Sequence, residues 1–429
     1  MQRLRFGAFV APHHPLGESP MLLFRRDIEL AERLDQLGYD EFWVGEHHSS
    51  GWETIGSPEL VIAAAGERTG NIRLGTGVIS LPYHHPFNVA SRLAQLDQMV
   101  RGRLIFGSGP GALPSDAHTL GIDPMVQRDR QDEAMGVIKR LLAGEDRFSY
   151  ESEWFTLRDA QLQILPYQEE MEMATASSLS PSGMVLAGKH GTGVISIAST
   201  SSEGLAALPT QWGFAESSAV EHGQTVDRRN WRVMMNWHIA ETREQARQEA
   251  VLGLQRWHNE YNVRVLGRPG AKHYDDAWKL LDTMVDSGAA VIGTPDDLVE
   301  AIRNLQVVTG GFGAAIGFAH DWANHDATRR SWEMVARYVI PEMTGQLRGL
   351  RASAGFLMEK QEELMGAASQ AVMAKIRETP GAYDALKVTL SKRSENPKKA
   401  PEWRPGADVT LPNGEAATGQ ETEAAASAD

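Results

Sequence analysis

The sequence predicts an α/β protein in which eight parallel strands, each followed by a helix, close into a (β/α)8 TIM barrel. Short runs rich in β-branched and aromatic residues alternate with segments whose apolar residues recur every three or four positions. This alternation indicates parallel strands joined by helical crossovers. Eight strands fit a closed barrel, whereas the alternative, an open doubly wound sheet, would carry a dinucleotide fingerprint that this sequence lacks.

The first four strand–helix units lie before residue 143. Strands are predicted at 4–10, 41–46, 72–81 and 103–109. The helix after the first strand has an apolar face and should stop at Gly38, a residue suited to a left-handed C-terminal cap. Ser57 and Pro58 form an N-cap and first-turn pair for the second helix. The third helix follows Pro86 and the fourth spans 125–142.

The second group of four strands is predicted at 171–177, 193–199, 231–240 and 311–320, with a short helix at 180–191. Thr242 and Gln245 resemble a capping box that opens the helix after the seventh strand. Thr294, followed by Pro295, opens the helix before the eighth strand.

Three segments complete the domain organisation around a barrel of residues 1–345. Residues 262–288 are rich in Gly, Pro, Lys and Asp and are expected to be an insertion before the last unit, acting as a lid. Residues 346–392 have a helical pattern and form a C-terminal extension. Residues 393–429 are polar and aperiodic, so this tail is expected to be disordered.

Composition excludes several classes of function. The 429-residue chain has a formal net charge of −14, which argues against a nucleic-acid partner, and no cysteine, which excludes disulfides, thiolate nucleophiles and cysteine-bound metals. The N-terminus lacks the continuous apolar segment of a signal peptide, and no apolar run approaches the roughly 18 residues that span a bilayer. A cytoplasmic enzyme that does not associate with membranes is therefore expected.

Histidines lie where several strands should end. The stretch GEHHSSGWE, residues 45–53, contains Glu46, His47 and His48 directly after the second strand, and reacting groups of a parallel barrel gather at the carboxyl ends of its strands. Histidine suits acid–base chemistry because its pKa lies near neutrality. Adjacent histidines point to opposite faces of a strand and no H-E-x-x-H motif occurs, so no metal site is predicted. A hydrogen-bonding role without chemistry is the alternative, above all for His84 and His85.

Two loops could approach a bound ligand. The segment FGSGPGALPSD, residues 106–116, has three glycines that allow close approach of the backbone to a flat molecule, although a tight loop also needs glycine. The segment ATASSLSPSG, residues 174–183, places serines around Pro181 at a predicted helix start. Hydroxyls and free N–H groups there would suit a phosphate, and simple N-capping is the alternative.

These motifs together resemble the luciferase-like flavin monooxygenase superfamily. The resemblance runs from the first strand to about Met343 and is dense over residues 38–121, where GYDEFWVGEHH and NIRLGTGVISLPYHHPFNVASRLAQLDQMVRGRLIFGSGPG match the second strand and the central signature. The segments PGALPSDA and GGFGAAIGFAHDWA are most similar to the limonene 1,2-monooxygenase-like branch.

The resemblance implies a barrel of the bacterial-luciferase type that binds FMN at its C-terminal face. Reduced flavin, FMNH2, would come from a separate NAD(P)H-dependent flavin reductase, typically NADH-dependent. It would react with O2 to give a C4a-(hydro)peroxyflavin, which inserts one oxygen atom into a small apolar, terpene-like substrate. Relatives of this kind are homo-oligomers, so a dimer or tetramer is expected.

The resemblance also assigns roles to residues. His47 falls on the family's histidine implicated in handling the flavin intermediate, and Glu46 on the preceding flavin-site carboxylate. His47 is expected to handle protons, and Glu46 to position the flavin or His47. Gly77 and Val78 fall where luciferases have a non-prolyl cis peptide. Cofactor contacts are expected from Gly77, Val78, Ser108, Gly109, Ser178, Ser180, Ser182 and Gly183. The substrate side is expected to be shaped by Trp52, Trp237, His238, His320 and Trp322.

Three departures from the family pattern concern the phosphate site. Pro110 replaces a phosphate-contacting arginine, Leu179 replaces a polar neighbour, and Gly183 replaces a hydroxyl. Backbone N–H groups, serines or a basic residue elsewhere must therefore contribute.

Other functions remain open from the sequence. One is a deazaflavin-dependent hydride-transfer oxidoreductase on the same barrel. A flavin-binding protein without turnover and a metallohydrolase are further alternatives.

Overall fold

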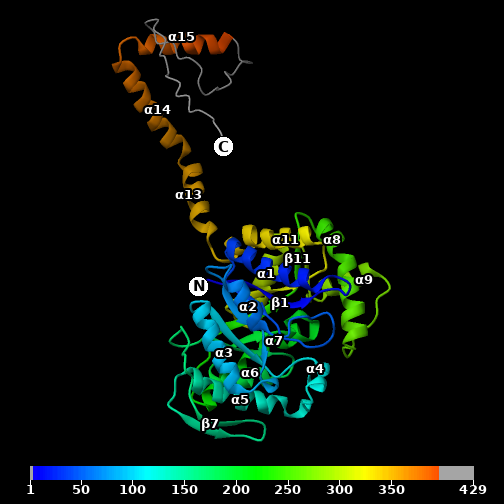
Figure 1. Cartoon of the computed structure of the whole chain (residues 1–429). Coiled ribbons are helices and arrows are strands. Elements are labelled where there is room, and N and C mark those ends of the chain that lie inside the picture. Colours follow the sequence, from blue (N-terminus) through cyan, green and yellow to red (C-terminus); the bar gives the residue numbers. More distant parts are fainter. Residues whose placement is uncertain (1–2, 396–429) are drawn as a thin grey trace, which may run out of the picture. The chain divides into compact units, whose positions relative to one another are not determined.

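Eight parallel strands pair in a closed ring, which confirms the predicted barrel. The computed structural model describes residues 3–395 (Figure 1). In ring order the strands are β1 (Arg5–His13), β2 (Glu41–Val44), β3 (Arg73–Thr76), β5 (Leu104–Gly109), β8 (Met173–Ser177), β9 (Gly193–Ser196), β10 (Trp231–Met235) and β13 (Ala314–His320). The ring closes because β13 pairs with β1, with Gly7 opposite Ile316.

Helices surround this ring. They are α1 (Pro20–Leu37), α2 (Pro58–Gly66), α3 (Pro86–Met99), α4 (Pro114–Thr119), α5 (Gln127–Leu142), α6 (Ser182–His190), α7 (Ser202–Glu221), α8 (Arg243–Arg256), α10 (Pro295–Thr309) and α11 (His325–Met334). Gly38 ends α1 with φ 80°, as predicted. Thr242 and Thr294 accept hydrogen bonds from the backbone of Gln245 and Asp297 as N-caps. Short helical turns η1 (Leu81–Tyr83), η2 (Pro124–Val126), η3 (Ala198–Thr200) and η4 (Arg228–Asn230) complete the connections.

Two predicted strands are interrupted. The strand expected over 72–81 divides into β3 and β4 (Ile79–Ser80), with a cis peptide between Gly77 and Val78 where the resemblance placed one. The strand expected over 231–240 divides at Asn236, whose Nδ2 donates to the carbonyl of Ala289 at 3.0 Å. Its second half, β11 (Trp237–Ile239), leaves the ring and pairs with β12 (Val291–Gly293).

The sequence patterns missed one hairpin and two helices. An antiparallel hairpin of β6 (Phe148–Glu151) and β7 (Thr156–Ala160) follows α5, and α4 and α7 were not anticipated. Strand β6 has no fully buried residue, and the two buried residues of β7, Leu157 and Ala160, lie three positions apart, so the hairpin gives only a weak period-2 apolar pattern.

The expected insertion over 262–288 is largely helical. Helix α8 continues into a π-helical segment, η5 (Trp257–Val265), and α9 (Ala277–Asp286) follows after a loop. Asp276 caps α9 by accepting from the backbone of Trp278 and Lys279, and α9 buries Leu280 and Leu281 against α8. The sequence did not predict this helix, because the segment 262–288 as a whole is polar and only Leu280 and Leu281 of α9 are buried.

A buried ionic cluster fills the amino-terminal end of the barrel. Arg232 Nε donates to Glu41 Oε2 at 2.7 Å, and both side chains are fully buried. The Trp43 indole donates to the same oxygen at 2.9 Å. Above this cluster the interior is apolar, with residues such as Phe9 and Ile316 in contact. The loops that follow the carboxyl ends of the strands, among them the loops after β2 and β5, lie at the opposite, C-terminal end of the barrel.

The chain divides between Arg348 and Gly349 into two units. The first ends with η6 (Val335–Val339) and α12 (Ile340–Met343). Beyond it the expected extension consists of α13 (Leu347–Glu359), α14 (Gln361–Glu378) and α15 (Ala382–Glu395). Residues 396–429, most of the tail predicted to be disordered, lie outside the described residues. Among the helices of residues 3–395, none is long and apolar enough to cross a bilayer.

Candidate active site

The loop after β2 brings Glu46 to the centre of three hydrogen-bond donors. Glu46 is 3 % exposed and accepts from the backbone N–H of Ser80 at 2.7 Å. His48 Nε2 and His84 Nε2 lie 2.9 and 2.6 Å from its Oε1. Burial alone would raise the pKa of Glu46, but the hydrogen bonds from the two histidines lower it. Glu46 is therefore a buried carboxylate that fixes the ends of β2 and β4 and orients two histidines.

His47 lies between two carboxylates. Its Nδ1 is 3.3 Å from Asp116 Oδ2, and its Nε2 is 3.3 Å from Glu53 Oε1. Burial opposes protonation, yet the hydrogen bond to Asp116 and the charge of Glu53 raise the pKa of His47. An imidazole with an acceptor at each nitrogen can donate at both only as the cation, so this site favours the imidazolium.

Asp116 was not anticipated as a site residue. It lies in the first turn of α4 and accepts from the backbone of His48 at 3.1 Å and from the hydroxyl of Ser49 at 2.5 Å. Glu53 was also missed, although it belongs to the GEHHSSGWE stretch. The signal for Glu53 was an acidic residue close to His47 in the same loop, whereas Asp116 had no local signal.

The glycine-rich segment after β5 has packing reasons for its small residues. A Cβ on Gly109 would lie 2.5 Å from Cγ2 of Val78, and a Cβ on Gly107 would lie 1.9 Å from the carbonyl oxygen of Thr76. These glycines allow β5 to pass beside the cis peptide region. Ser108 is fully buried, and its hydroxyl accepts from Gln131 at 3.5 Å.

The start of α6 has the features of an anion site. Its first turn has no side-chain cap, so the alternative of plain N-capping is not what the structure shows. The hydroxyls of Ser180 and Ser182 lie 2.7 Å apart, and Ser178 is exposed nearby. Arg128 of α5 donates from Nε to Ser182 Oγ at 3.3 Å. Arg128 thus places a cation at the start of α6. It is a basic residue elsewhere in the chain, as expected because Pro110 stands where the resemblance implies an arginine.

The other two departures have structural explanations. A Cβ on Gly183 would lie 2.3 Å from the carbonyl oxygen of Ala176, so glycine allows α6 to pack against β8. The side chain of Leu179 is exposed, and its carbonyl accepts from Gln211 at 3.1 Å. Neither position provides a side chain for an anion.

Two of the predicted substrate-side residues lie together. The His320 and Trp322 rings stack with centroids 3.6 Å apart. Burial lowers the pKa of His320 to about 3, so its ring is neutral, and neither ring nitrogen has a hydrogen-bond partner. Trp52 is 1 % exposed, and the centroid of its ring lies 5.5 Å from that of Tyr261.

The remaining two predicted substrate-side residues contact the helical layer. The Trp237 ring packs edge-on against Trp332 of α11 with centroids 5.4 Å apart. His238 Nε2 lies 2.9 Å from Glu249 of α8, and burial lowers the pKa of His238. The structure does not bring these two side chains into contact with His47.

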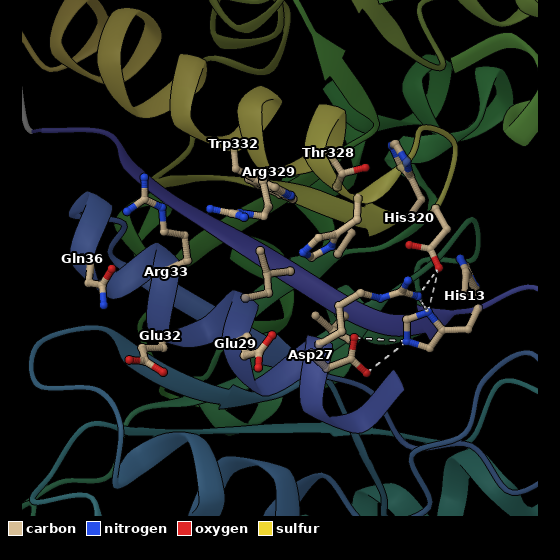
Figure 2. Close-up of a pocket in the computed structure, with 17 residues that line it drawn as sticks. His13, Asp27, Glu29, Glu32, Arg33, Gln36, His320, Thr328, Arg329 and Trp332 are labelled. Carbon is tan, nitrogen blue, oxygen red and sulfur yellow. Dashed lines mark hydrogen bonds and ion pairs between the residues drawn. The ribbon is translucent and has the colours of Figure 1, made fainter. Parts of the chain in front are cut away.

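A separate cavity of about 270 Å³ lies between α1 and α11, outside β1 (Figure 2). It extends from Gln36 to His320. On its wall, His14 Nε2 is 3.1 Å from both oxygens of Asp27, and His14 Nδ1 is 2.9 Å from Asp321. Burial disfavours the charged form of His14, but the hydrogen bonds to Asp27 and Asp321 and their negative charges raise its pKa to about 9. This network ties β1 to α1 and to the loop after β13.

Several buried polar atoms at the C-terminal end have no partner, although such atoms are normally hydrogen-bonded. They are Trp52 Nε1, Thr54 Oγ1, Trp237 Nε1, the side-chain amide of Asn262, both ring nitrogens of His320, and Trp322 Nε1. Neutral donors of this kind suit an uncharged polar ring system or substrate. Across residues 3–395, no group of three or more His, Asp or Glu side chains is arranged to bind a metal.

Comparisons with known proteins identify the family. The model of the family described as luciferase-like monooxygenase matches residues 4–311. The chain is 47% identical over 371 residues to 4-hydroxyprotoasukamycin monooxygenase of Streptomyces nodosus subsp. asukaensis, covering 86% of this chain and 100% of that protein. It is also 47% identical over 347 residues to limonene 1,2-monooxygenase of Rhodococcus erythropolis, covering 80% and 88%.

A solved structure is similar over nearly its full length. It is the oxygenating constituent of 3,6-diketocamphane monooxygenase from Pseudomonas putida, a type II Baeyer-Villiger monooxygenase in complex with FMN. The identity is 27% and the TM-score 0.67, with 79% of this chain and 99% of that chain covered. With the closed barrel, the histidine-rich mouth and these matches, the chain belongs to the luciferase-like monooxygenase family and is a monooxygenase.

Proposed function

We propose that the chain is the oxygenase component of a two-component, FMN-dependent monooxygenase that acts on a small apolar, terpene-like molecule. A separate NAD(P)H-dependent reductase would supply FMNH2. The balanced reaction consumes substrate, O2 and FMNH2 and yields the substrate with one added oxygen atom, FMN and water. Reduced flavin supplies the two electrons that activate O2, and the protein supplies binding, orientation and proton control.

The uncapped start of α6 is the observation that carries the flavin proposal. Two hydroxyls, Ser180 and Ser182, and the guanidinium of Arg128 meet at helix N–H groups that no side chain caps. A terminal phosphate matches this combination of donors and charge. The FMN bound by the 3,6-diketocamphane relative gives further support.

His47 would control a proton beside the flavin. Its two carboxylate neighbours raise its pKa, so a larger fraction of the side chain is protonated at neutral pH than in a solvated histidine. Glu46 would act on the flavin site indirectly, because its oxygens are occupied by Ser80, His48 and His84.

The aromatic residues around the mouth support an apolar substrate. Trp52 and Trp322 are almost fully buried, and each presents an indole ring with an unpartnered N–H. Such rings offer apolar contact area and a single donor for a polar group of the substrate. The limonene 1,2-monooxygenase relative acts, by its name, on a terpene.

Anaerobic titration with reduced FMN tests this function. Wild type should bind reduced FMN, and Arg128→Ala should weaken that binding about 10-fold, the effect of losing one exposed charge-assisted hydrogen bond. Riboflavin, which has no phosphate, should bind both proteins equally. Arg130→Ala is the matched control, because Arg130 lies over the ring of Trp154 instead. Absence of FMN binding, or tighter binding of a deazaflavin with substrate turnover that needs no O2, would overturn the proposal.

A further inference from the structure

Glu53 lies at the centre of a buried cluster that the family assignment does not explain. Its Oε1 is 3.3 Å from both His13 Nε2 and His47 Nε2. Its Oε2 accepts from the hydroxyl of Tyr261 at 2.5 Å. Glu53 is 5 % exposed and Tyr261 1 %, so the cluster is shielded from solvent.

The two histidines of this cluster are held in different protonation states. The Trp257 indole donates to His13 Nδ1 at 3.3 Å, which leaves the His13 proton on Nε2, facing Glu53. Burial lowers the pKa of His13, in keeping with this neutral tautomer. His47 has carboxylates at both nitrogens and favours the cation. Glu53 thus faces the Nε2 of both rings, while Trp257 and Asp116 occupy the Nδ1 of His13 and of His47.

Trp257 and Tyr261 lie four residues apart on η5, which leads into the loop and α9. The Tyr261 ring packs against His13 with centroids 4.6 Å apart and against Trp52 at 5.5 Å. Helix η5 therefore contacts the end of β1 and the loop after β2 through aromatic rings and one phenolic hydroxyl. Segments of π-helix occur frequently at functional sites.

We propose that Tyr261 and Glu53 form a latch that docks the segment 257–286 onto the mouth of the barrel and positions His47. Both are positioning residues, and the proposal rests on the proposed flavin function for its catalytic consequence. When Tyr261 is docked, its hydroxyl directs Oε2 of Glu53 and leaves Oε1 for His13 and His47. When Tyr261 is undocked, Glu53 loses its shortest hydrogen bond, the one from the Tyr261 hydroxyl, and the pocket admits water. The Glu53 carboxylate is then no longer held in place as an acceptor for His47.

Other charged groups surround the Glu53 cluster. Asp116 of α4 and Glu46 lie near His47, and both raise its pKa. Burial lowers the pKa of His13 and raises the pKa of Tyr261, and the nearby positive charge of Arg268, in the loop after η5, favours a lower pKa for both. Glu53 is the carboxylate common to His13, His47 and Tyr261.

Tyr261→Phe tests the latch because it removes one hydroxyl and retains the ring. Tyr274→Phe is the matched control. It removes a hydroxyl from the same segment, where Tyr274 contacts His258 through its ring and not Glu53. In the flavin-free protein, amide hydrogen exchange over 257–286 should accelerate about 10-fold in Tyr261→Phe and stay unchanged in Tyr274→Phe.

Glu53→Gln tests the coupling to His47. Histidine NMR of the flavin-free protein, with the His47 signal assigned by its loss in His47→Asn, should show a lower pKa of His47 in Glu53→Gln. A purely structural role for Glu53 would leave that pKa unmoved. The amide exchange and the pKa of His47 are both measured on the flavin-free protein. They therefore test the latch even if the protein does not bind flavin and the proposed function is wrong.

In the loaded enzyme, Tyr261→Phe should lower kcat for product about 10-fold, raise hydrogen peroxide release and leave KM for reduced FMN unchanged. Equal exchange in the two tyrosine variants, or an unchanged pKa of His47 in Glu53→Gln, would overturn the latch.

Discussion

Replacing Glu46 by glutamine should destabilise the protein by an amount set by its three hydrogen bonds. The carboxylate accepts from Ser80, His48 and His84 at 2.7, 2.9 and 2.6 Å. Hydrogen bonds to a charged group contribute about 1.5–3 kcal/mol and neutral ones about 0.5–1.5, so each of the three weakens by about 1 kcal/mol. A reorienting amide can keep some of these partners. We therefore expect a loss of about 2–3 kcal/mol in the free energy of unfolding at pH 7.

The stability difference between wild type and Glu46→Gln should decrease as the pH falls. The folded-state pKa of Glu46 is lowered, so its stabilising effect is present above the unfolded-state pKa and disappears as pH falls through the folded-state pKa. Urea unfolding followed by tryptophan fluorescence should show a gap between wild type and Glu46→Gln at pH 7 that narrows in acid. Glu145→Gln, which alters an exposed ion pair with Arg140, is the control and should leave stability unchanged. A gap below about 0.5 kcal/mol at pH 7, or one independent of pH, would refute the reasoning.

Two further predictions concern buried side chains. Glu41→Gln should lower the free energy of unfolding by about 3–5 kcal/mol in urea, because the buried Arg232 loses one of its two carboxylate partners, the other being Glu172, and Arg5 loses its ion pair with Glu41. The double variant Glu41→Leu, Arg232→Met should recover much of that loss, and failure to recover would contradict this explanation. His320→Phe should leave Tm unchanged or raised in the ligand-free protein, since neither ring nitrogen is bonded and the stack on Trp322 persists. Differential scanning calorimetry checks this, and a drop of more than about 3 °C, or about 1 kcal/mol, would show an overlooked partner.

Local patterns were sufficient for most of the barrel. Buried strands such as β5 and β13 are short apolar runs, and the helices between them bury one face, so periodicity distinguishes them along the chain. The same patterns could not detect the break at Asn236, because that break depends on a hydrogen bond to Ala289, 53 residues later. They also missed the β6–β7 hairpin, because β6 has no fully buried residue and the two buried residues of β7 do not alternate.

The sequence by itself determined the barrel and the placement of Glu46 and His47 directly after β2, because these depend on residues that are close along the chain. Only the tertiary structure decided which partners complete the site. Asp116 reaches His47 across 69 residues, Arg128 reaches Ser182 across 54, and Tyr261 reaches Glu53 across 208. Hydrogen bonds and charge pairing act over a few ångströms in space, and closure of the barrel is what brings these separated segments within that range.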